Sequence, residues 1–131
     1  MEVRIILATL WIAVGFCLVT GAILGLFKPG YIQGLIEEQI DGIKITQNVL
    51  LGNAFIIMMP ALMAVLSLIL TYPAIRWLNL IACAFFIVLI LMTYVYYMTQ
   101  GVQTWMYYNV LKIFELALYT LIIKYSWSWA N

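Results

Sequence analysis

The sequence predicts an all-α integral membrane protein, a bundle of four transmembrane helices with a short amphipathic interfacial helix between the first two. Hydrophobic residues make up 67% of the 131 residues and charged residues only 8%, whereas a soluble domain has about 25% charged residues. A soluble core in a chain this short could not hide so many apolar side chains, because small domains bury the smallest fraction of their surface. The apolar residues also gather in four long runs.

Each apolar run reaches the length of about 20 residues that a spanning helix needs. Backbone polar groups in lipid must be satisfied internally, and the runs lack the period-two alternation of a barrel strand, so we expect helices. The first run is long and has no clear small-residue cleavage site, so we interpret it as a span rather than a removed signal peptide. The predicted spans of this single membrane domain are residues 5–27, 46–71, 74–98 and 104–127.

The long connection between the first two spans, residues 29–44, is predicted to form a short amphipathic helix in the membrane interface. Pro29 suits a helix start and Gly42 a helix stop. An ordered loop is the alternative. The apolar residues that recur at helical spacing are Ile32, Leu35, Ile36 and Ile40.

Four spans place both termini on one side of the cell membrane, and the basic residues predict that this side is cytoplasmic. It carries Arg4, Arg76 and Lys124, against Lys28 and Lys44 on the other side, and the positive-inside rule counts such residues. A formal net charge of +1 gives no indication of nucleic acid as a partner. Four tryptophans are predicted to form an aromatic belt near the cytoplasmic boundary: Trp11, Trp77, Trp127 and Trp129.

Signatures of catalysis and metal binding are missing from the sequence. The chain has no histidine, which removes the commonest metal ligand and the usual proton shuttle near neutral pH. Its two cysteines, Cys17 and Cys83, lie inside apolar runs and suit packing rather than metal binding. The sequence contains no phosphate-binding glycine loop. These observations favour a protein that is not an enzyme, and they identify no cofactor.

The first span carries a ridge of small residues at a strict four-residue step. Small side chains let helices approach closely in lipid, where packing drives association. This small-residue ridge predicts a helix-packing surface, either between copies or subunits of a membrane complex or against another span of the same chain. Its members are Thr9, Ala13, Cys17, Gly21 and Gly25.

The fourth span holds two ionisable residues deep within its apolar run. Lys112 and Glu115 are three residues apart and share a helix face. Glu115 lies roughly 17 Å along the helix from Thr104, near the membrane midplane, where an unpaired charge costs at least about 2.5–3.5 kcal/mol. Tyr108 and Tyr119 extend the same stripe, which must therefore face protein or water. The pair either neutralises itself and orients the helix, or lines a polar pocket or an ion or proton path.

Amide and tyrosine side chains concentrate in the half of the bilayer next to the long connection, whereas Ser67 and Asn79 are isolated in the other half. Apolar walls with a few convergent polar groups are typical of small-ligand sites. Ordinary hydrogen bonding between helices, with an interfacial tyrosine belt, is the alternative. The predicted ligand-binding residues of the outer half are Asn53, Tyr94, Tyr108, Lys112, Glu115 and Tyr119.

Several short stretches carry a family resemblance: Pro29-Gly30, Ile45-Thr46-Gln47, Leu50-Leu51-Gly52, Met59-Pro60, Leu66-Ser67, Arg76-Trp77-Leu78-Asn79 and the region of Glu115. Together they resemble a family of small prokaryotic four-span membrane proteins with no assigned function. The resemblance implies an acidic residue just before the proline of the second span, where this chain has Met59, so that role is absent or taken over by Glu115. In overall shape this family is similar to DoxX-like membrane proteins, some of which are small subunits of quinone-linked oxidoreductases.

Two functional hypotheses follow from these observations. In the first, a non-enzymatic membrane protein binds a small or lipophilic ligand, or assists its passage, in the outer-half pocket. In the second, the chain is a structural or accessory subunit of a membrane complex, either a homo-oligomer or, by the DoxX-like resemblance alone, a quinone-linked redox complex.

Overall fold

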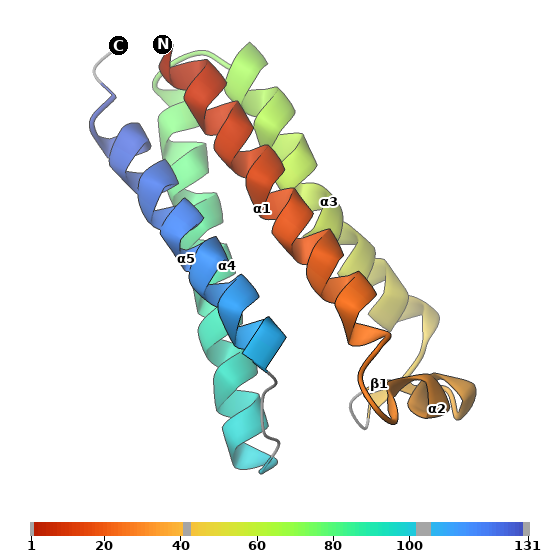
Figure 1. The fold of residues 1–131 in the computed structure, drawn as a ribbon. Coiled ribbons are helices and arrows are strands. Elements are labelled where there is room, and N and C mark those ends of the chain that lie inside the picture. The colour runs from red at the N-terminus through yellow and green to blue at the C-terminus, as the bar shows by residue number, and fades with distance from the viewer. Residues whose placement is uncertain (1, 41–42, 102–105, 130–131) are drawn as a thin grey trace.

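The computed structural model describes residues 2–40, 43–101 and 106–129 as an up-and-down bundle of long helices. The beginning of α1 and the end of α5 lie at the same end of the bundle (Figure 1). A short helix, α2, and an antiparallel hairpin of strands β1 and β2 link α1 to α3 at the opposite end. The elements are α1 (Val3–Gly25), α2 (Tyr31–Ile36), β1 (Gln39–Ile40), β2 (Ile43–Lys44), α3 (Gln47–Ile69), α4 (Ala74–Thr99) and α5 (Met106–Trp127).

The predicted fold class is confirmed. The helices α1, α3, α4 and α5 are each long and apolar enough to cross a membrane, by length and composition. α1 packs most extensively against α3 and α5, α4 packs mainly against α5, and α3 and α4 make few contacts. The pairs α1/α3 and α4/α5 lie close at the end with the termini and diverge toward α2 (Figure 1).

A threonine cap marks the beginning of α3, and the helix continues through an internal proline. Thr46 precedes the helix, and its hydroxyl oxygen accepts a hydrogen bond from the Val49 backbone N–H at 3.2 Å, which is the usual N-cap contact. Pro60 lies inside α3 without ending it, although a proline removes one backbone hydrogen bond. Gly15 of α1 packs here, since a methyl group on it would lie 3.7 Å from Pro60 Cβ.

The connection between α1 and α3 differs from the single helix predicted over residues 29–44. α2 has six residues and its end is followed by Glu38, whose backbone is left-handed at φ 61°. That turn stops the helix and starts the hairpin, in which Gln39 pairs with Lys44. The helical spacing therefore holds only as far as Ile36, and the expected stop at Gly42 lies outside the described residues.

The two halves of the bundle are packed to very different degrees. We call them the terminal half, which contains the start of α1 and the end of α5, and the hairpin half, which contains α2 and the β1–β2 hairpin. Among the described residues, all that are buried, except Gly25, lie in the terminal half or at the bundle middle. The largest buried apolar side chains there are Leu7, Trp11, Val14, Ile75, Phe86, Tyr119 and Ile122.

A buried polar network in the terminal half corrects two expectations from the sequence. Trp11 is fully buried rather than part of an aromatic belt, and its indole N–H donates to Asn79 Oδ1 at 2.6 Å. The Ser67 hydroxyl lies 3.5 Å from the same oxygen and donates to the Met63 carbonyl at 2.7 Å. Ser67 and Asn79 are therefore not isolated, because three helices meet around them. Sequence spacing within one helix does not reveal such neighbours.

Two arginines cap helix ends in the terminal half. Arg4 of α1 donates to the carbonyls of Ser67 and Leu70 at the end of α3. Arg76 of α4 donates to the carbonyls of Ser126 and Trp127 at the end of α5, both at 3.0 Å. The last carbonyls of a helix lack partners within it and carry partial negative charge, so cations stabilise them. These arginines thus fasten neighbouring helices to one another.

The end of the small-residue ridge lies against α5 of the same chain. A methyl group on Gly21 would lie 3.5 Å from Leu111 Cδ1, and one on Gly25 would lie 3.7 Å from the Tyr107 hydroxyl oxygen. Thr9, at the other end of the ridge, is exposed. The glycines therefore bring α1 close to α5, as small residues do between membrane helices.

Gly21→Leu tests this contact, with Gly52→Leu as its matched control on the open face of α3, where an added Cβ meets nothing within 4 Å. We expect Gly21→Leu to lower the free energy of unfolding by about 1–3 kcal/mol, because overpacking forces side chains or backbone to move. Gly52→Leu should cost little. Tryptophan fluorescence during denaturant unfolding in micelles measures both. Equal stability of Gly21→Leu and the parent would mean that the ridge faces something other than α5.

Candidate functional site

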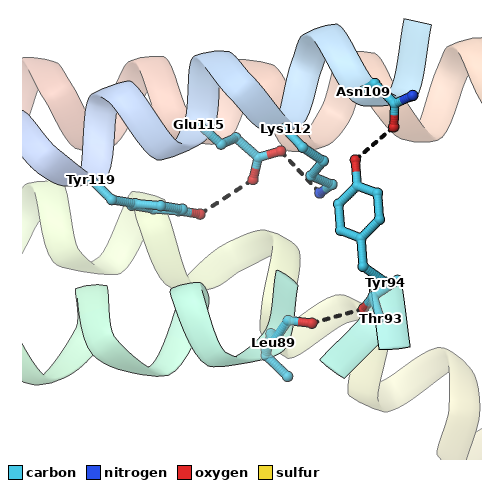
Figure 2. A network of polar contacts seen from close by, with 7 residues as sticks. All are labelled: Leu89, Thr93, Tyr94, Asn109, Lys112, Glu115 and Tyr119. Carbon is cyan, nitrogen blue, oxygen red and sulfur yellow. Dashed lines mark hydrogen bonds and ion pairs between the residues drawn. The ribbon is translucent and has the colours of Figure 1, made fainter. Parts of the chain in front are cut away.

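The buried pair Lys112 and Glu115 forms the centre of the candidate site, on the face of α5 that points into the bundle. Lys112 Nζ lies 2.9 Å from Glu115 Oε2, and the two side chains are 18% and 1% exposed. The Tyr119 hydroxyl donates to Glu115 Oε1 at 3.2 Å, so each carboxylate oxygen has a partner (Figure 2). The Lys112 ammonium also lies 5.2 Å from the centre of the Tyr108 ring, within cation–π range.

A second polar contact lies beside the ion pair, between α4 and α5. The Tyr94 hydroxyl donates to Asn109 Oδ1 at 2.7 Å, and Figure 2 shows Tyr94 reaching from α4 toward α5 next to Lys112. The Tyr94 and Tyr108 rings are 5.6 Å apart between centroids. The Thr93 hydroxyl donates to the Leu89 carbonyl of its own helix at 2.8 Å. Tyr94 thus lies beside the ion pair, on its side toward the hairpin half.

A cavity of about 140 Å³ adjoins the ion pair in the middle of the bundle. All four long helices contribute to it, with Leu18 from α1 and Ile56 from α3. The Phe86 and Tyr119 rings stack at 5.7 Å and form its wall toward the terminal half. We call this space the central cavity; its remaining lining residues are Leu89, Ile90, Thr93, Tyr108, Lys112 and Glu115.

A larger pocket of about 420 Å³ lies between α3 and α4 in the hairpin half, where these helices make few contacts. Leu89 and Thr93 line both this pocket and the central cavity, so the two spaces adjoin. We call it the α3–α4 groove; its other lining residues are Ile43, Val49, Asn53, Met92, Tyr96 and Tyr97.

The structure brings four of the six predicted ligand-binding residues to one cavity and places two beside it. Tyr108, Lys112, Glu115 and Tyr119 line the central cavity. Tyr94 contacts Tyr108, and Asn53 lines the α3–α4 groove. Sequence reasoning missed the apolar wall on α4, although its members follow helical spacing and that signal could have found them: Phe86, Leu89 and Ile90.

Lys112 and Glu115 bring a hydrogen-bond donor and an acceptor to the central cavity. Across the described ranges, no group of three Cys, Asp or Glu side chains is placed to hold a metal ion. An ammonium has three N–H donors, and within those ranges Glu115 is the ion-pair partner of Lys112. The ammonium therefore retains hydrogens for a further acceptor in the cavity.

The stability of charge variants tests whether the pair is ionised and coupled. Lys112→Met alone should lower the free energy of unfolding by about 3–5 kcal/mol, because it leaves the buried Glu115 carboxylate without its cation. Lys112→Met/Glu115→Gln should recover most of that loss, since two neutral side chains need no counter-ion. Denaturant unfolding in micelles measures both variants, with the exposed Lys124→Met as control. A double variant no more stable than Lys112→Met would show that the two side chains do not interact.

Comparisons with known proteins place the chain in a family of unknown function. No curated protein and no solved structure shows a significant match to it. One family model, described as a family of unknown function, matches residues 2–131. This agrees with the sequence resemblance to small four-span proteins with no assigned function, while the similarity to DoxX-like proteins stays a prediction. The chain therefore belongs to the family of unknown function DUF6326.

Proposed function

We propose that the protein is a non-enzymatic membrane protein that binds a small or lipophilic ligand, or assists its passage, in the central cavity. The observation that carries the proposal is the cavity of about 140 Å³ beside an ion pair, lined by residues of all four long helices. Close packing normally leaves few spaces larger than a water molecule between helices. A space lined by a charged pair within lipid is costly unless something polar fills it.

The residues of the central cavity would have different roles in ligand binding. Lys112 would donate to an acceptor group of the ligand. Glu115 would hold the Lys112 ammonium in place through their 2.9 Å ion pair, and Tyr119 would hold the carboxylate in place through its 3.2 Å hydrogen bond. Leu18 and Ile56 supply apolar surface opposite these groups. Apolar walls with few polar groups are the usual composition of a small-ligand site.

The alternative, an accessory subunit of a membrane complex, rests on the small-residue ridge. Gly21 and Gly25 of that ridge lie against Leu111 and Tyr107 of the same chain, so contacts within the chain already use this part of it. The ligand-binding function has the stronger support.

Molecules that co-purify with the protein test the proposal. The parent and Lys112→Met/Glu115→Gln, extracted in a gentle detergent, are compared by mass spectrometry of their organic extracts. We expect a lipophilic molecule in near-stoichiometric amount with the parent and at least a tenfold loss from the double variant. Lys124→Met/Glu37→Gln makes the same charge changes at exposed positions and should keep the molecule. Identical extracts from parent and double variant would contradict a cavity site.

A further inference from the structure

The size of the central cavity limits what it can hold alone. Ligand pockets usually have volumes of about 300–1,000 Å³, and the central cavity has about 140 Å³. The adjoining α3–α4 groove has about 420 Å³, which falls near the lower end of that range. A molecule with one end on Lys112 therefore needs the groove for its remainder. The groove suits one hydrocarbon chain better than the two chains of a phospholipid.

The groove provides a route from the side of the bundle. Met92 and Tyr96, which line it on α4, are 63% and 38% exposed. Since α4 is a candidate membrane span, its exposed surface meets lipid. Leu89 and Thr93 lie where the groove meets the cavity. An amphiphile could thus move from the membrane into the bundle with its chain still in apolar surroundings.

The charges of the ion pair indicate which chemical group the ligand presents to Lys112. Lys112 and Glu115 together carry no net charge, and Glu115 is 1% exposed. A ligand anion would add a third charge between membrane-spanning helices, where a charge without its own partner is expensive. A neutral ester or ketone oxygen accepts a hydrogen bond from the ammonium without that cost. The pair therefore favours a neutral acceptor.

We propose that the ligand is a neutral, single-chain amphiphile whose ester or ketone oxygen accepts a hydrogen bond from Lys112 and whose chain lies in the α3–α4 groove. It enters sideways from the membrane leaflet that surrounds the hairpin half. This inference rests on the proposed function of the central cavity and adds the class of ligand and its route.

Photo-crosslinking in lipid nanodiscs tests the inference, using a monoacylglycerol that carries a diazirine midway along its chain. The crosslinked peptides of the parent should map to the groove, at Val49, Met92 and Tyr96. Met92→Trp fills the groove from an exposed position and should reduce the yield at least fivefold. Leu91→Trp is the matched control, because Leu91 is 59% exposed at the same depth on α4 and lines neither pocket.

Two further arms separate the outcomes. Lys112→Met/Glu115→Gln should also lose at least fivefold, and a fatty-acid anion with the same diazirine chain should label the parent at least fivefold less. Loss in the double variant with full labelling of Met92→Trp would overturn the groove route and leave the proposed function standing. Full labelling of the double variant would overturn both this inference and the proposed function of the central cavity. Equal or stronger labelling by the fatty acid would overturn the inference that the ligand presents a neutral acceptor to Lys112.

Discussion

The ion pair between Lys112 and Glu115 constrains how α5 can face its neighbours, because lipid offers neither charge a partner. With the Nζ–Oε2 distance at 2.9 Å and the carboxylate 1% exposed, that face of α5 must point into the bundle. The same rotation carries Tyr119 inward, where it stacks on Phe86 and contacts Trp11 with ring centroids 5.7 and 6.3 Å apart. One electrostatic requirement thus sets the partners of the aromatic core.

The bundle combines a half with many buried side chains and a half with few, and the ion pair lies at their boundary. The terminal half has buried aromatic rings, the hydrogen bonds around Asn79 and two arginines that cap neighbouring helices. The hairpin half has the α3–α4 groove, between two helices that make few contacts with each other. Binding sites are usually drawn from the less stable part of a protein, since that part can open. The ion pair therefore lies between the half with many buried side chains and the half that holds the α3–α4 groove.

Much of the fold and part of the site could be predicted from sequence, for distinct physical reasons. Hydrophobic length alone locates the long helices, and the depth and spacing of Lys112 and Glu115 require an inward face. The pairing of Asn79 with Trp11 could not be predicted, because it depends on which helices become neighbours. Asn53 shows the same limit, since membrane depth matched it to Lys112 but helix rotation places it in the groove.

The prediction of a single helix after α1 was wrong for another reason. Helical spacing continued past Ile36, yet the left-handed backbone at Glu38 redirected the chain into a hairpin. A single residue's conformation in a short segment outweighs a weak periodic pattern, because a helix of that length is marginal in water. Long spans have no such competition, since their backbone groups have no alternative partner in lipid.

Infrared difference spectroscopy of the parent against Glu115→Gln in lipid bilayers at neutral pH tests most directly whether a charged pair lies within the membrane. A charged pair predicts that the substitution removes a carboxylate stretching band and leaves the carbonyl region of protonated acids unchanged. Loss of a protonated-acid carbonyl band instead would show that Glu115 is neutral. The inward face of α5 would then need another explanation.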